Sequence, residues 1–228
     1  MEIDISKLTL EEIDKYGISI YQDPKYFKFS IDAFCLADFA KRYIKKESRY
    51  MDLCSGTGIV GILISQSPFI DRASFVEINP YFVAINKINL QINRIEGDVV
   101  CRDIRDLSAH YPREYFDAIS INPPYMKEGH GLKTINFHKD LAKIEGSEDF
   151  LAILFNVAFY LLRDKGELYM VHRVERLVDI FEASRKHKME AKTMQFIRNK
   201  KSKKASLVLL RFVKNGGRFL DNLDDYVI

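Results

Sequence analysis

Short apolar runs alternate along this chain with longer stretches in which apolar residues recur every three or four positions. The short runs predict buried strands, and the periodic stretches predict helices that pack against them. The expected strands are 50–53, 73–77, 99–102, 116–121, 166–172, 193–197 and 205–212. The expected helices are 31–44, 59–65, 80–91, 149–162 and 174–187. Residues 8–20 fit neither pattern and are expected to form an irregular arm.

Strands and helices that alternate in this order predict an α/β protein with a doubly wound, mostly parallel sheet of the Rossmann type. The last two expected strands are joined by a loop too short for a helical crossover, so this final pair is expected to be antiparallel. We divide the chain into an N-terminal arm and helix, 1–45, that covers a ligand site, and a main domain, 46–228, that ends in a basic hairpin. The stretch 126–148 is long for an unstructured connection and is expected to be functional or mobile.

A glycine loop follows the first expected strand. The sequence Cys54-Ser55-Gly56-Thr57-Gly58 stands between that strand and the apolar helix 59–65. Glycine lets the backbone approach a ligand closely, and the start of the helix favours an anionic group. The stretch 56–61 also satisfies the G-x-G-x-x-G pattern of dinucleotide-binding proteins, so a nicotinamide enzyme is an alternative. Against it, the chain has little room for the second catalytic domain that such dehydrogenases usually carry.

Acidic or amide residues stand at the ends of four strands, at Asp52, Glu77, Asp103 and Asn122. Glu77 follows the glycine loop by about twenty residues, a position from which a carboxylate accepts from ribose hydroxyls. Asp103 suits an adenine amine, although a turn or capping role is the alternative for it. The ordered series suggests S-adenosylmethionine (SAM) as the cofactor. The expected cofactor-binding residues are Asp52, Cys54, Gly56, Gly58, Glu77, Ile78, Asp103, Ile104 and Asn122.

The tetrapeptide Asn122-Pro123-Pro124-Tyr125 predicts chemistry at a planar amino group. Such an amine is a poor nucleophile because its lone pair is delocalised, and the Asn122 side-chain oxygen and Pro123 carbonyl can accept its two hydrogens. Proline restricts its own backbone and that of the preceding residue, so these acceptors are held rigidly. Tyr125 offers a face on which a flipped base can stack, with Tyr26 or Phe29 closing the other side. A strand-ending turn is the alternative for so short a motif. We expect these four residues to be the catalytic ones.

Composition narrows the possible classes of protein only slightly. The 228 residues, with 47% hydrophobic and 12% aromatic content, fit one folded domain. The three cysteines show no metal-binding spacing, so we expect no metal, no disulfide framework and a reducing cytoplasm. Cys54 is expected to fill space in the loop rather than to act as a nucleophile. No apolar stretch reaches the length of a membrane span, and the N-terminus lacks a signal-peptide pattern. We expect a cytoplasmic monomer.

The net charge of +3 is unevenly distributed. Eleven Lys or Arg residues lie between 185 and 214, against the single acid Glu190. A basic run of this kind is often only a solvated hairpin, but it can also contact nucleic-acid phosphates without reading sequence. The residues expected to bind RNA in this run are Arg198, Lys200, Lys201, Lys203 and Lys204.

With these motifs placed, the chain resembles class I SAM-dependent methyltransferases and, more narrowly, the tRNA1(Val) adenine-N6 methyltransferase family. The resemblance covers nearly the whole chain and depends on the segments 27–33, 52–58, 122–125 and 171–177. It implies a tRNA partner and methylation of adenine 37 beside the anticodon. It also implies that Ser30 and Asp32 close over the methionine end of SAM, and that His172 and Arg173 face the RNA. From the residues alone, Ser30 and Asp32 are equally a helix cap and a first-turn acid.

Other functions stay open from the sequence. A protein glutamine-N5 methyltransferase presents a similar amide to the same tetrapeptide, but the residues before Asp52 are too few for the helical domain that such enzymes usually carry. A DNA adenine methyltransferase would need a target-recognition domain, of which there is no sign. An RNA-binding protein that has lost the chemistry is a third alternative, and the intact glycine loop argues against it.

Overall fold

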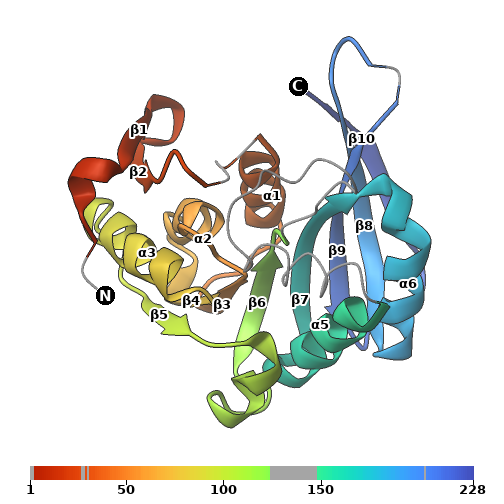
Figure 1. The fold of residues 1–228 in the computed structure, drawn as a ribbon. Helices are drawn as coiled ribbons and strands as arrows, with labels where there is room; N and C mark the ends of the chain where they lie inside the picture. The colour runs from red at the N-terminus through yellow and green to blue at the C-terminus, as the bar shows by residue number, and fades with distance from the viewer. Residues whose placement is uncertain (1–2, 27–28, 30, 124–147, 203) are drawn as a thin grey trace.

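The computed structural model describes residues 3–26, 29, 31–123, 148–202 and 204–228 (Figure 1). Its centre is an eight-stranded sheet with the order β10-β8-β9-β7-β6-β3-β4-β5. The strands of this sheet are β3 Ser48–Leu53, β4 Ile70–Glu77, β5 Asp98–Cys101, β6 Phe116–Ile121, β7 Leu162–Arg173, β8 Met189–Arg198, β9 Leu207–Lys214 and β10 Asp221–Val227. The remaining described strands, β1 Thr9–Ile13 and β2 Ile18–Gln22, form a separate antiparallel hairpin.

Neighbouring strands of the large sheet are parallel except at β9, which is antiparallel to both β7 and β8. The predicted fold class and the predicted antiparallel pair are therefore confirmed. The sequence did not predict β10, which lies parallel to β8 at one edge of the sheet. Most of its residues are exposed and several are acidic, as in a protected edge strand, so no apolar run marks it.

Helices cover both faces of the sheet (Figure 1). The helices are α1 Ile31–Lys41, α2 Ile59–Ser65, α3 Pro80–Ile92, α5 Glu148–Leu161 and α6 Leu177–Lys186, and the short 3-10 turns are η1 Ile5–Lys7, η2 Asp14–Tyr16, η3 Ile104–Ala109 and η4 Val174–Arg176. The predicted helix 174–187 is thus divided into η4 and α6. None of the helices in the described ranges combines the length and the apolar character that crossing a membrane requires.

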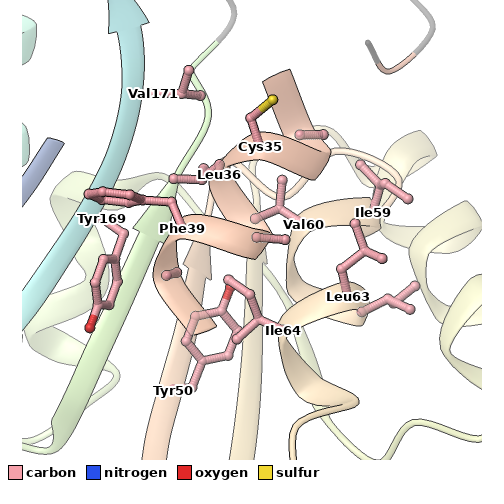
Figure 2. Packing of buried hydrophobic residues seen from close by; sticks show 14 of the residues in the cluster. Cys35, Leu36, Phe39, Tyr50, Ile59, Val60, Leu63, Ile64, Tyr169 and Val171 are labelled. Carbon is pink, nitrogen blue, oxygen red and sulfur yellow. The ribbon is translucent and has the colours of Figure 1, made fainter. Parts of the chain in front are cut away.

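Alternate residues of the central strands enter two apolar cores. Tyr50 of β3 and Tyr169 of β7 belong to the core under α1 and α2, whereas Met51 and Met170 belong to the core under α5, α6 and η3. This follows from the two-residue period of a strand. Figure 2 shows side chains of α1 and α2 facing Tyr50 and Tyr169, and the Phe39 ring meets the Tyr169 ring edge to face at 6.4 Å. Helix α1 is therefore part of the main core.

The prediction of an irregular arm at residues 8–20 was wrong. Strands β1 and β2 pair there, joined by η2 and by Gly17, whose φ is +63°. Ile18 and Ile20 alternate with polar residues and are buried in the same core as α1. That short alternation is the signal that predicts a half-buried strand.

Candidate active site

The strand register brings the predicted site residues to one edge of the sheet. Leu53 at the end of β3 lies opposite Val76 of β4 and Ile121 of β6, and Glu77 lies opposite Cys101 of β5. Adjacent strands are separated by about 4.8 Å. The residues that follow, Cys54 of the glycine loop and Asn122 of the tetrapeptide, therefore leave the sheet from neighbouring strands at its carboxyl edge, where ligands bind in such folds.

The glycine loop has three residues in the left-handed region, Cys54 at φ +55°, Gly56 at +52° and Gly58 at +92°. The Ser55 amide donates to the Val76 carbonyl at 2.9 Å, and the Gly58 amide donates to the Ser55 carbonyl at 2.8 Å. A Cβ added at Gly56 would meet no atom within 4 Å, so this side of the loop faces open space. A loop that is anchored at its base and open at Gly56 fits an adenosyl cofactor.

The third glycine of the G-x-G-x-x-G pattern has a packing role. A Cβ on Gly61 would lie 2.2 Å from the Phe75 ring and 3.0 Å from an Asp52 oxygen. Only glycine allows α2 to approach β4 this closely. The pattern is thus fulfilled by backbone geometry and helix–strand contact that several nucleotide-binding proteins share, so the match to the dinucleotide pattern does not by itself favour a nicotinamide enzyme.

Glu77 is buried and holds the loop to the start of α3. Its Oε2 accepts from the Gly56 amide at 2.9 Å, and its Oε1 accepts from the Asn79 amide at 2.8 Å. Burial raises the pKa of the Glu77 carboxyl, while the backbone N–H groups of Asn79, Gly56 and Ile78 act in the opposite direction. A carboxylate accepts about four hydrogen bonds. The oxygens of Glu77 therefore retain capacity for ribose hydroxyls.

Asp52 lies behind the glycine loop. Its Oδ2 accepts from the Gly61 amide at 3.0 Å, and its Oδ1 accepts from the Ser120 hydroxyl, which also contacts the Tyr50 hydroxyl at 2.5 Å. The residue is 1% exposed. Both carboxyl oxygens thus join β3 to α2 and β6, a geometry that supports the loop from beneath. We interpret the predicted role of Asp52 at the cofactor as this indirect one.

The buried Asp52 carboxyl gives a testable pH dependence. Burial, opposed by the Ser120 and Gly61 hydrogen bonds and helped by the Glu77 charge, raises its pKa from 3.8 to about 7. The folded state then holds a proton that the unfolded chain has lost, so this group makes unfolding easier as pH rises from about 4 to 7.

Asp52→Asn is expected to abolish this dependence because an amide does not titrate between pH 4 and 8. The fold is kept because the amide oxygen can accept from Gly61 and the NH2 group can donate to Ser120. The free energy of unfolding of Asp52→Asn relative to the wild type should rise by on the order of 2–4 kcal/mol between pH 5 and 8. Urea unfolding at four pH values measures it. His172, whose pKa is lowered to about 4, acts in the opposite direction in both proteins and cancels in the difference. Parallel pH curves for the two proteins would contradict this assignment.

Asp103 caps η3, which corresponds to the alternative given for it above. Its Oδ1 accepts from the Arg105 amide at 2.9 Å, and the Arg105 side chain pairs with both carboxyl oxygens. That pairing lowers the pKa of the Asp103 carboxyl. Ile104 begins η3 and packs against the core under α5. An adenine amine at Asp103 would share the carboxylate with Arg105, so this contact stays a prediction.

The tetrapeptide is described as far as its second residue. Asn122 is half-buried and Pro123 is buried, directly after β6. Four predicted site residues lie outside the described residues, namely Ser30, Pro124, Tyr125 and Lys203. Asp32 is buried in the first turn of α1, where its Oδ1 accepts from the Ala33 amide at 3.1 Å. This placement matches the first-turn acid expected from the residues alone.

The predicted RNA-binding residues lie around the carboxyl ends of β7 and β8. Arg173 is paired across the sheet with Leu207, and Ile197 is paired with the same residue from the other side. The loop between β8 and β9, which carries the exposed lysines 200, 201 and 204, extends from the edge at which β6 also ends (Figure 1). Arg198 is half-buried and pairs with Asp225 at 2.7 Å, so its charge is already matched.

His172 is not a cationic contact at neutral pH. It is 7% exposed, and its Nδ1 accepts from the Arg173 amide at 2.8 Å. Burial and then the nearby Arg176 lower the pKa of the imidazole to about 4. Any role of His172 towards RNA therefore uses a neutral ring.

Sequence reasoning missed two buried asparagines beside the loop, Asn86 and Asn89 on α3. The Asn86 side chain donates to the Ser55 hydroxyl at 3.0 Å, and the Asn89 side chain donates to the Thr57 carbonyl at 2.9 Å. The available signal was the presence of asparagines at positions 86, 89 and 93 of an otherwise apolar helix face.

A separate cavity of about 830 Å³ lies between α3, η3 and the free edge of β5, lined by residues such as Lys87, Asp98 and His110. None of the predicted site residues lines it. In the part of the chain that the structure describes, no cluster of three His, Cys, Asp or Glu side chains is arranged to hold a metal ion.

The chain is similar in sequence to known proteins. Residues 33–197 match the methyltransferase small domain family. A tRNA1(Val) (adenine(37)-N6)-methyltransferase from Histophilus somni (strain 129Pt) is 30% identical over 157 residues, which cover 67% of this chain and 63% of the relative. The match thus spans less than two thirds of the length of that relative.

Solved structures show the same fold at low identity. A predicted O-methyltransferase from Agrobacterium tumefaciens superposes with a TM-score of 0.66 at 16% identity, over 86% of each chain. TYW2 from M. jannaschii in complex with AdoMet superposes with a TM-score of 0.60 at 14% identity, over 91% of this chain and 87% of that one. Both likenesses agree with the predicted α/β class.

Proposed function

Because the chain belongs to the methyltransferase small domain family, we propose that it methylates N6 of an adenine in tRNA with SAM as the methyl donor. Adenine 37 of tRNA1(Val) is the first candidate. The observation that carries the proposal is the register of β3 and β6. Leu53 and Ile121 are opposite each other, so the glycine loop and Asn122 begin at adjacent points of one edge.

The residues present fit this cofactor. Gly56 leaves open space where a Cβ would stand, and Glu77, which accepts from the Gly56 amide of the loop and the Asn79 amide before α3, offers its remaining acceptor capacity to a ribose. When bound, SAM supplies an electrophilic methyl carbon, so the protein itself mainly has to position and polarise the amine.

Asn122 and Pro123 are the residues that bind the amine. The side-chain oxygen of Asn122 and the backbone carbonyl of Pro123 accept the two amine hydrogens, which directs the nitrogen lone pair out of the base plane. Pro123 is buried and restricts the backbone at this point. Little conformational entropy is therefore lost when the acceptors bind the amine. As the new N–C bond forms, the C–S bond of SAM would break, and the nitrogen would then release its extra proton to water, so Asn122 would not need to act as a base.

The tRNA partner is supported by charge and by relatives. The exposed lysines of the β8–β9 loop lie on the same edge as the glycine loop, where they can contact the phosphates of an RNA whose base enters the site. The Histophilus somni relative acts on tRNA1(Val) according to its name.

The experiment is incubation of the protein with methyl-labelled SAM and total tRNA, followed by nucleoside analysis. We expect N6-methyladenosine in tRNA, and its loss when a tRNA1(Val) transcript carries guanine in place of adenine 37. Label in protein instead of tRNA would favour the glutamine-N5 alternative. SAM binding without transfer to either would favour a silent binding module.

A further inference from the structure

The inner face of α3 carries a row of asparagines that connects two distant parts of the chain. Asn86 and Asn89 are fully buried, and Asn93 follows at the end of the helix, half-buried. Residues three and four apart on a helix lie on one face, so the three side chains point the same way. On one side of this row is β2 of the N-terminal hairpin, and on the other is the glycine loop.

Two of these asparagines pair with β2 as a neighbouring strand would. The Asn93 side-chain oxygen accepts from the Ser19 amide at 2.9 Å, and its nitrogen donates to the Ser19 carbonyl at 2.6 Å. Asn89 does the same at Tyr21, with distances of 2.7 and 3.0 Å. A two-stranded hairpin is marginal by itself in water. The side-chain amides of α3 thus satisfy the edge of β2 that β1 leaves free.

Each amide makes one further contact, and only that of Asn89 reaches the glycine loop, because the Asn93 nitrogen donates instead to the Asn89 carbonyl at 2.7 Å. The same Nδ2 that donates to Tyr21 also donates to the Thr57 carbonyl at 2.9 Å, between the two glycines of the loop. Both hydrogens of this amide are therefore used, one for the hairpin and one for the loop. Turning the amide to improve one hydrogen bond weakens the other. A single rigid group thereby links the position of β2 to the backbone geometry of residues 56–58.

Asn86 limits the movement of the loop beside this link. Its nitrogen donates to the Ser55 hydroxyl at 3.0 Å, and its oxygen would lie 2.6 Å from a Cβ on Gly58. The loop is thus packed against α3 at Gly58 and hydrogen-bonded to α3 at Thr57. A shift of the Thr57 carbonyl turns the Thr57–Gly58 peptide and with it the backbone of the neighbouring Gly56, the position that faces open space.

We propose that Asn89 is a positioning residue for the cofactor, through which the docked N-terminal hairpin holds the glycine loop in its binding geometry. The inference rests on the proposed use of SAM. In this role Asn89 does not contact the cofactor itself. Because coupling between two sites is reciprocal, SAM binding should also hold β2 more firmly against α3.

The test compares Asn89→Ala with Asn93→Ala, a matched variant that removes the same kind of hairpin pairing but no loop contact. Thermal unfolding and SAM affinity by calorimetry are measured for both and for the wild type. We expect similar losses of melting temperature, a SAM Kd raised about tenfold in Asn89→Ala and a Kd within twofold of wild type in Asn93→Ala. Equal Kd changes in the two variants, or none in Asn89→Ala, would overturn the inference while leaving the proposed function intact.

A second measurement needs only the wild type, in case Asn89→Ala fails to fold. Hydrogen exchange of the Ser19 and Tyr21 amides is followed with and without saturating SAM. We expect SAM to slow exchange at both amides by at least threefold. Unchanged exchange despite SAM binding overturns the inference. A wild type that binds no SAM overturns the proposed function, and the inference with it.

Discussion

Asn122→Ala is expected to lower the rate of methyl transfer by about 10²–10³-fold, the size of effect seen when one polarising hydrogen-bond partner is removed from an active site. The physical reason is that the amine then keeps one hydrogen without an acceptor, and its lone pair stays in the ring. Asn122 is half-buried at the end of β6. Its removal leaves the glycine loop and Glu77 in place, so SAM affinity should change by less than about threefold. Single-turnover rates and calorimetric SAM titration measure the two effects separately.

Asn122→Asp is the informative companion variant. A carboxylate cannot donate a hydrogen bond, but it can still accept one from the amine. We therefore expect Asn122→Asp to keep more activity than Asn122→Ala. If Asn122→Ala methylated tRNA at near the wild-type rate, this result would contradict the amine-polarising role of Asn122. If it lost SAM binding and turnover to the same extent, the contact with the cofactor that is also expected of Asn122 would account for the whole effect.

The sequence predicted the strands that build the site because those strands are buried on both faces. Ser48–Leu53 and Phe116–Ile121 each bury all but one of their residues, their sequences are mostly apolar at 50–53 and 116–121, and each is followed by residues that a tight strand-end turn requires. Once both strands are assigned, parallel pairing places Asn122 beside the glycine loop. The meeting of these two motifs could thus be predicted without coordinates.

What the sequence could not predict depends on contacts between distant segments. Asn89 reads as an unremarkable polar residue of a helix until β2 and Thr57 are seen on either side of it. The direction of the Asp52 carboxyl, towards Gly61 and Ser120 and behind the loop, is likewise set by packing. Strand β10 carries acids on an exposed edge, so its pattern is that of a loop.

Gly58→Ala is expected to lower the free energy of unfolding by about 2–5 kcal/mol, the sum of a left-handed backbone penalty and overpacking. Gly58 has a φ of +92°, and a Cβ there would lie 2.6 Å from Oδ1 and 2.9 Å from Cγ of Asn86. Asn86 is fully buried, and its nitrogen is hydrogen-bonded to Ser55, so it cannot withdraw without breaking that bond. Urea unfolding gives the loss of stability, and calorimetry should show SAM binding weakened at least tenfold.

Gly56→Ala is the matched control because the two glycines share the left-handed conformation but differ in surroundings. At Gly56 the φ is +52°, and a Cβ meets no atom within 4 Å. Its stability loss should therefore be limited to the backbone penalty of about 1–2 kcal/mol. The added methyl group would stand on the open side of the loop. The loss in the free energy of SAM binding should therefore exceed the loss in the free energy of unfolding. Equal stability losses for the two variants would mean that Asn86 gives way at little cost, and the close packing of the loop on α3 would then not be what requires glycine at position 58.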